Sequence, residues 1–240
     1  MIESLGKGRR VHRDIGKAYV FKVLNIMKHY YSLRDIEKML DLPAQTIWKY
    51  VNLMIVPEEK TVAKIISKVD ELRVIDRLID ESLREFRENP VKVLSKPGFL
   101  KLFSYVAESF VGNAKIDLVI PVSNIAMILG SYLATELPSI LCPFTEDPIH
   151  DKKGYVVAYY ANTEGVNFMA MPRSCLKEKP TSLLIDVTLD ELNKLRSVLE
   201  ALSRAKVNVY GVVAVEASDD VWDFVKNNGL RLTTLRHRHY

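Results

Sequence analysis

The stretch that decides the fold is TSLLIDVTLDELNKLRSVL, residues Thr181–Leu199. It predicts a buried strand at Ser182–Ile185, followed by an acidic residue, a turn and a helix with leucines at helical spacing. A second apolar strand is predicted at Val207–Val215. Strand, helix and strand in succession form a βαβ unit with parallel strands, so the class is α/β. Because ligands bind at the carboxyl ends of such strands, we expect a site at the turn after Ile185.

The flanking sequence predicts more elements of the same kind. Apolar runs and turn residues predict helices, strands and a hairpin joined by the turn Asn162–Gly165, with a polar loop at Thr145–Gly154 before it. The predicted elements are helix Phe99–Val111, strand Ile116–Val122, helix Ser123–Leu137, strand Ile140–Phe144, hairpin strands Tyr155–Ala161 and Val166–Met171, helix Asp219–Asn227 and strand Leu230–Leu235.

The organising stretch resembles the signature of type I phosphoribosyltransferases. In that family the strand ends in two adjacent acids, which hold the ribose of phosphoribosyl pyrophosphate, and a Thr-Gly-Gly-Thr loop cradles the 5′-phosphate. Aligning the helix LRSVLEALSRA puts the acid pair on Asp186 and Val187 and the loop on Glu191–Lys194. One acid remains and both glycines, which let a backbone approach a phosphate, are absent. The resemblance implies the fold of a transferase without its catalysis.

The turn that binds pyrophosphate in the same family is also altered. It falls on Val122–Ile125 and contains no glycine. The hairpin segment resembles the hood of orotate-type enzymes, and its tyrosines either pack on a half-buried ribbon or stack on a nucleobase. No cofactor is expected. No metal is expected either, because His237 and His239 lack a third ligand and fit a solvated or phosphate-contacting basic tail better. The candidate ligand-binding residues are Ser123, Asn124, Tyr159, Tyr160, Arg173 and Asp186.

Positive charge is concentrated near the N-terminus. Residues 1–60 hold 11 Lys/Arg against 7 Asp/Glu, whereas the other 180 residues hold 23 of each. A basic N-terminal unit favours a polyanionic partner, nucleic acid or membrane surface, over a plain solvated tail.

The segment SLRDIEKMLDLPAQTIWKYVN, Ser32–Asn52, resembles the helix-turn-helix of bacterial repressors. Ser32 is the expected N-cap, with Asp35 completing an approximate capping box. Asp41 occupies the turn, where most such motifs use Gly, and Asp tolerates a left-handed conformation better than most residues. Pro43 opens the second helix. A preceding helix is predicted at Ala18–Tyr31.

The helix-turn-helix resemblance assigns two kinds of contact to duplex DNA. Side chains on the second helix would read base edges, and basic residues before it would bind phosphates. The alternative is a helical hairpin used for protein contact, with Trp48 in an interface. The candidate DNA-binding residues are Arg9, Arg10, Arg13, Lys17, Ala44, Gln45, Thr46, Trp48, Lys49 and Asn52.

A long apolar stripe predicts one helix at Glu58–Glu88, buried against a partner subunit or the C-terminal domain. We therefore expect a multidomain α+β protein with three parts. These are an all-α helix-turn-helix domain at 1–60, a linker helix at 61–95 and an α/β phosphoribosyltransferase-like domain with a parallel sheet and hood hairpin at 96–240.

Cys142 and Cys175 form no CxxC pair, and two buried free thiols are expected. No run of 18 apolar residues and no signal sequence is found, so neither a membrane span nor secretion is expected. These features favour the cytoplasm.

Three functions remain open at this stage. The whole chain resembles archaeal regulators that join a helix-turn-helix to a phosphoribosyltransferase-like domain (the GfcR group) and, more loosely, the bacterial purine repressor. The resemblance implies a non-enzymatic homodimer that binds double-stranded DNA, with a nucleotide or nucleobase as a candidate effector. The alternatives are an architectural or RNA-binding dimer without operator specificity and an active nucleobase phosphoribosyltransferase.

Overall fold

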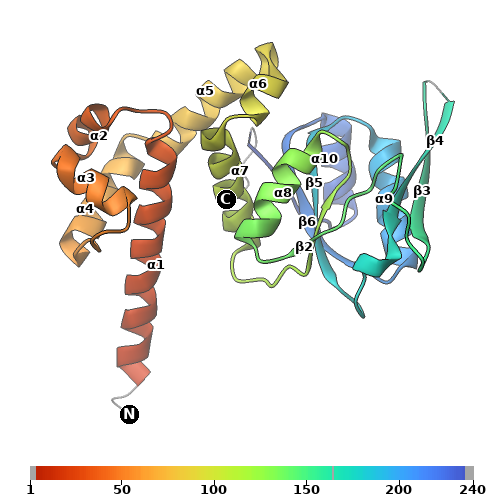
Figure 1. Cartoon of the computed structure of the whole chain (residues 1–240), viewed down its shortest axis with the longest axis horizontal. Helices are drawn as coiled ribbons and strands as arrows, with labels where there is room; N and C mark the ends of the chain where they lie inside the picture. The colour runs from red at the N-terminus through yellow and green to blue at the C-terminus, as the bar shows by residue number, and fades with distance from the viewer. Residues whose placement is uncertain (1–3, 164, 236–240) are drawn as a thin grey trace. The chain divides into compact units, whose positions relative to one another are not determined.

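The computed structural model describes the backbone of residues 4–163 and 165–235 and the side chains of residues 16–163 and 165–235. The chain forms two compact units, Met1–Leu102 and Phe103–Tyr240, and each is described by itself (Figure 1). In the described part, no helix is both long and apolar enough to cross a membrane.

In its described part, the first unit contains helices joined by turns and loops, and no strand. One buried face of each helix supplies the core, for example Leu24, Ile36, Ile47 and Ile65, all 0% exposed. The helices are α1 (Ser4–Met27), α2 (Leu33–Leu40), α3 (Ala44–Val51), α4 (Glu59–Glu71), α5 (Val74–Glu88) and α6 (Pro90–Leu94), and α7 (Pro97–Val111) continues into the second unit.

Two predicted helix boundaries in this unit are wrong. The helix expected at Ala18–Tyr31 begins at Ser4 and ends at Met27. The single helix expected at Glu58–Glu88 is interrupted, because α4 ends and Arg73 takes a left-handed conformation with φ 47° before α5 begins. The apolar stripe continues across the break, so hydrophobic spacing alone gave no sign of it.

The turn between α2 and α3 is built as expected. The Ser32 hydroxyl accepts a hydrogen bond from the Asp35 amide at 3.2 Å and donates one to the Asp35 carboxylate at 2.6 Å. Asp41 caps the end of α2 with φ 51°. Lys64 of α4 donates to both the carbonyl (2.6 Å) and the carboxylate (2.7 Å) of Asp41. The Ser32 bonds thus fix the start of α2, and the two bonds from Lys64 attach the turn at its end to α4.

The second unit contains a five-stranded, fully parallel sheet in the order β2-β1-β5-β6-β7. Apolar residues fill both faces of its central strands, as a parallel sheet covered on both sides requires. The strands are β1 (Leu118–Pro121), β2 (Ile140–Leu141), β5 (Thr181–Leu189), β6 (Asn208–Ala217) and β7 (Leu232–Thr234), connected in part by α8 (Ala126–Glu136), α9 (Leu192–Arg204) and α10 (Asp219–Asn227).

The crossovers run in opposite directions from the middle of the sheet, and this places the helices on opposite faces. The connection β1–α8–β2 moves one way, whereas β5–α9–β6 moves the other. Figure 1 shows α8 on one side of the strands and α9 on the other. Gly130 lets α8 approach closely, since a Cβ there would lie 2.4 Å from Cγ of Pro121.

The predicted hairpin is confirmed as β3 (Tyr155–Asn162) and β4 (Gly165–Pro172). Its inner face packs on α9, where the Asn193 side-chain amide donates to the Ala161 carbonyl at 3.3 Å. Two backbone hydrogen bonds between Thr145 and Ala170 (3.0 and 2.8 Å) attach the base of the hairpin to the preceding loop.

Two predicted strand ends are corrected. The strand expected to stop at Ile185 continues to Leu189, because Val187 and Leu189 are also buried and Thr188 and Leu189 still pair with β6. The turn expected after Ile185 therefore follows Leu189. The strand expected at Ile140–Phe144 is assigned to two residues only, although Cys142 and Phe144 still bond to the backbone of β1.

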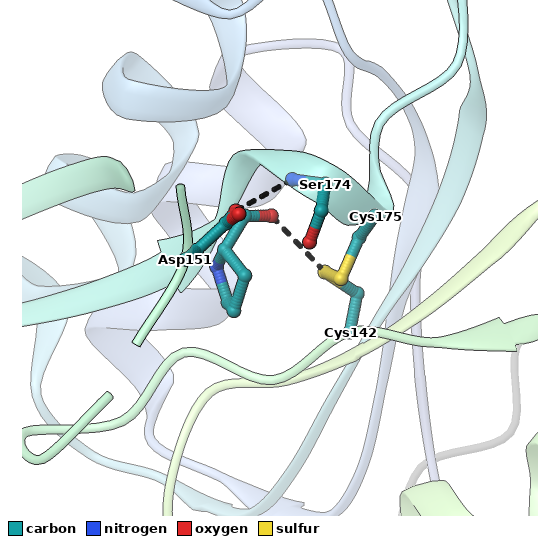
Figure 2. The surroundings of a disulfide bond; sticks show 5 residues. Cys142, Asp151, Ser174 and Cys175 are labelled. Atoms are coloured by element: carbon teal, nitrogen blue, oxygen red, sulfur yellow. Dashed lines mark hydrogen bonds between the residues drawn. A yellow bond between two sulfur atoms is a disulfide. The ribbon is translucent and has the colours of Figure 1, made fainter. Parts of the chain in front are cut away.

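The two cysteines are not free thiols. A disulfide joins Cys142, just after β2, to Cys175, with the Cα atoms 6.0 Å apart (Figure 2). Cys175 lies in the 3₁₀ turn η1 (Arg173–Cys175), directly after β4. The fold brings the two together across 33 residues of sequence, a separation at which no local pattern predicts pairing. The thiol argument for a cytoplasmic location therefore fails.

Candidate functional site

Ser123 and Asp186 meet where the direction of the crossovers reverses. Ser123 follows β1, and Asp186 lies on the neighbouring strand β5. This reversal point at the carboxyl edge is where ligands bind in open α/β sheets. The Ser123 hydroxyl donates to Oδ1 of Asp186 at 2.6 Å and accepts from the amide of Ala126 at 3.3 Å. The serine thus links the carboxylate to the start of α8.

Asp186 is a buried carboxylate, 4% exposed. Its Oδ1 also accepts a hydrogen bond from the Val187 amide at 2.8 Å. The Lys194 ammonium lies 4.0 Å from Asp186 Oδ2 and 3.9 Å from Glu191 Oε2. Burial raises the pKa of Asp186, and nearby Lys194 and the bonds from Ser123 and Val187 partly oppose that rise. The chain therefore supplies its own counter-ion and donors here.

Little space is left around this cluster. The cavity has a volume of about 10 Å³, about enough for one water molecule. Pockets for small molecules typically measure about 300–1,000 Å³. The cavity is lined by Val122, Asp186, Thr188, Leu189, Asp190, Glu191, Lys194 and Leu195.

The segment aligned with the phosphate loop is not a loop. Glu191 precedes α9, and Leu192, Asn193 and Lys194 form its first turn. Asn193 reaches the hairpin and Lys194 reaches Asp186. Sequence reasoning missed Lys194 as the partner of Asp186, because its place three residues after Glu191 on a helix predicts only the pair with Glu191.

The other candidate ligand residues have different surroundings. Asn124 is exposed. Tyr159 is 65% exposed and pairs with Phe168 on the outer face of the hairpin, with ring centroids 6.3 Å apart. Tyr160 is buried, and burial raises its pKa. Arg173 donates to the Tyr155 carbonyl at 3.1 Å. The tyrosines thus divide into one buried packing residue and one exposed ring.

No group of three or more metal-ligating side chains was found among the described residues. The histidines of the tail, His237 and His239, lie outside the described part of the chain. Within the described residues, the second unit also has a groove of about 600 Å³ between α9, β6 and α10. Its lining includes none of the candidate ligand residues.

The candidate DNA-binding residues of α3 and the residue after it form one surface. Gln45, Trp48 and Asn52 are exposed, and Lys49 is half-buried beside them. Their spacing places them on one face of a helix, opposite the buried Ile47. Ala44, Thr46 and Lys17 are half-buried. The side chains of Arg9, Arg10 and Arg13 lie outside the described part.

Known structures share the fold of this chain at low sequence identity. Adenine phosphoribosyltransferase from Rhodothermus marinus aligns with a TM-score of 0.51 at 15% identity, over 58% of this chain and 79% of the enzyme. The enzyme from Thermoanaerobacter pseudethanolicus aligns with a TM-score of 0.50 at 15% identity, over 60% and 84%. The Giardia lamblia enzyme, solved with 9-deazaadenine, gives 0.52 at 16% identity, over 62% and 85%.

The α/β unit has a type I phosphoribosyltransferase-like fold. At such low identity the likeness concerns the fold alone. No protein-family model matches the sequence. No curated protein matches it either.

Proposed function

We propose that this protein is a DNA-binding transcriptional regulator. In this proposal α2 and α3 form a helix-turn-helix, and α3 is the recognition helix. The observation that carries the proposal is the exposed face of Gln45, Trp48 and Asn52, presented by a helix whose opposite side is buried and whose preceding turn is fixed by Lys64. A helix of this kind fits the major groove of duplex DNA.

The side chains on this face suit base recognition in different ways. The Gln45 amide can pair bidentately with adenine, and Lys49 can bond to guanine. The Asn52 amide nitrogen already donates to the Trp48 carbonyl at 2.8 Å, so bidentate pairing with adenine requires this side chain to rotate. Lys17 and the arginines before it supply phosphate contacts, which fix register without reading sequence.

In this proposal the phosphoribosyltransferase-like unit is catalytically inactive. The support is the Asp186–Lys194 cluster and its cavity of about 10 Å³. A phosphate at this position would be repelled by the Glu191 carboxylate. It would also find no glycine-rich loop whose backbone N–H groups could bind it. The unit instead serves homodimerisation, and an effector of the nucleotide or nucleobase class would have to bind outside this closed position. No cofactor takes part, and we place the protein in the cytoplasm with its DNA.

An architectural or RNA-binding dimer without operator specificity is the second candidate. It is favoured by the basic charge of residues 1–60, which binds any polyanion. An active nucleobase phosphoribosyltransferase is the third, and the fold alone favours it.

The deciding experiment compares the affinity for duplexes selected from genomic DNA with the affinity for random duplexes at one salt concentration. A regulator prefers its site about 1,000-fold or more, whereas a ratio near one indicates the architectural class. Gln45→Ala should remove preference at one base pair and keep salt-dependent binding to random DNA. Val91→Ala, at an exposed site on α6, is the matched control and should change neither. Uniform weakening on all sequences by Gln45→Ala would contradict base reading.

A further inference from the structure

The disulfide Cys142–Cys175 lies at the base of the β3–β4 hairpin and links it to the sheet. Cys142 follows β2, and its amide donates to the Val119 carbonyl of β1 at 3.0 Å. Cys175 belongs to the segment that leaves β4. The bond therefore closes a loop that contains both the polar segment Thr145–Gly154 and the whole hairpin.

The two sulfur-bearing residues differ in exposure. Cys142 is 0% exposed, whereas Cys175 is half-buried. A thiolate from solvent must reach a sulfur atom along the bond axis to break a disulfide. Cys175 is therefore the side open to attack, and Cys142 is the leaving group.

The loop Thr145–Gly154 and the residues that follow β4 are also joined by hydrogen bonds that do not involve the disulfide. The Ser174 amide donates to Oδ2 of Asp151 at 2.7 Å, drawn in Figure 2, and the Asp151 amide donates to the Tyr155 hydroxyl at 2.9 Å. The Arg173 amide donates to the Gly154 carbonyl at 3.0 Å. A reduced chain thus retains noncovalent bonds across the base of the hairpin.

A reduced Cys142 also has an acceptor for its proton. Its sulfur lies 3.8 Å from the Pro172 carbonyl oxygen, within reach of a weak S–H donor. A buried thiol beside a carbonyl is a stable neutral group, so breaking the disulfide leaves no unsatisfied charge in the interior.

We propose that Cys142–Cys175 is a thiol–disulfide exchange site that takes a small dithiol as its reductant. One thiolate of the dithiol attacks Sγ of Cys175, the S–S bond breaks, and Cys142 leaves with the electron pair and takes up a proton. The second thiol of the reductant then displaces Cys175. The protein gains two electrons and two protons, and the dithiol becomes a disulfide.

The exchange would change how firmly the hairpin is held. The far end of β3 bonds to Asn193 in the first turn of α9, next to Lys194 of the Asp186 cluster. Oxidation fastens the base of this hairpin to the sheet, and reduction leaves it held by hydrogen bonds alone. The hairpin and the loop Thr145–Gly154 should therefore become more mobile on reduction, while the sheet stays intact.

The test uses the full chain purified without reductant, alkylation under native conditions and mass spectrometry of the peptides. Before reduction we expect no alkylation, and after dithiothreitol we expect Cys175 to react several-fold faster than Cys142. Far-UV circular dichroism should be unchanged, and the melting temperature should fall by about 10 °C. Reoxidation by oxidised dithiothreitol should restore both the bond and the melting temperature.

Two single variants serve as controls. Cys175→Ser and Cys142→Ala should each melt close to the reduced protein and should not respond to dithiothreitol. Free thiols that fail to reoxidise in the folded protein would overturn the proposal. Reduction that occurs only in denaturant, or that abolishes the far-UV signal, would also overturn it, because the bond would then be an inert structural link.

Discussion

The ammonium of Lys194 lies 4.0 Å from the carboxylate of Asp186. The pair lies where the connections after the adjacent strands β1 and β5 run in opposite directions. Both side chains are largely buried, with side-chain exposures of 15% and 6%. In a phosphoribosyltransferase-like fold this edge of the sheet is the expected ligand position. An internal ion pair there, together with the Ser123 hydrogen bond, gives the chain a self-sufficient cluster in place of an open pocket.

Replacing Asp186 by Asn should remove a pH dependence of stability. The pKa of Asp186 is raised by burial, so on raising the pH the unfolded chain loses this proton first. The free energy of unfolding therefore falls as pH rises from the unfolded pKa to the folded pKa, and is constant above it. In urea titrations between pH 3.5 and 7, the free energy of unfolding of Asp186→Asn should lack this fall with pH. A slope that stays unchanged would show that Asp186 does not titrate in this way.

Replacing Lys194 by Met should make the free energy of unfolding depend more strongly on pH. Without the ammonium, the pKa of Asp186 rises further, since Lys194 is the main influence that lowers it. The loss of stability should be about 1–3 kcal/mol at pH 8 and smaller in an acidic buffer, because protonation of Asp186 removes the charge with which Lys194 pairs. Lys226→Met, at an exposed site on α10, is the control and should cost little at either pH. Equal losses at both pH values would argue for lost packing instead.

Replacing Lys206 by Gly should stabilise the second unit. Lys206 follows α9 with φ 61°, and the Val207 amide closes the helix end by donating to the Leu202 carbonyl at 2.9 Å. An L-residue in this conformation costs about 1–2 kcal/mol, part of which is offset by the extra freedom of glycine in the unfolded chain. We expect a gain of about 0.5–1 kcal/mol in urea unfolding. Lys226→Gly, inside the last turn of α10, should lose about 1 kcal/mol.

Replacing Gly130 by Ala should destabilise the same unit, although alanine is the better helix former. The added Cβ would lie 2.4 Å from Cγ of Pro121 and 3.4 Å from Cδ1 of Leu141. Separating α8 from β1 should cost about 1–3 kcal/mol, which exceeds the gain of about 1 kcal/mol in helix propensity. Ser131→Ala, one residue along on the exposed side, should be near neutral. A Gly130→Ala protein that melts higher would disprove the close contact.

Much of the fold followed from local signals in the sequence. The apolar stretches around Ser182 and Val212 and the helix between them specified parallel strands, and the structure has them as β5 and β6. The Ser32 cap and the left-handed Asp41 were also readable, because capping depends on residue type at fixed positions. The hairpin followed from a turn between two strand-like runs.

The features that were missed depend on distant contacts or on atypical residues. The disulfide joins cysteines that only the folded sheet brings together. The break at Arg73 uses a left-handed residue that is neither Gly nor Asn. The ion pair between Lys194 and Asp186 can be predicted only if one knows that β5 extends to Leu189 and that α9 begins at Leu192. The sequence therefore predicted the strand that carries Asp186 but not the contacts that Asp186 makes.

In our proposal, the ligand position of this phosphoribosyltransferase-like unit is closed by its own side chains. Isothermal titration calorimetry of the full chain with phosphoribosyl pyrophosphate and Mg²⁺ tests it most directly. Because a cavity of about 10 Å³ beside Glu191 admits no sugar phosphate, we expect no binding heat up to millimolar ligand. A saturable heat with a micromolar dissociation constant would contradict the claim.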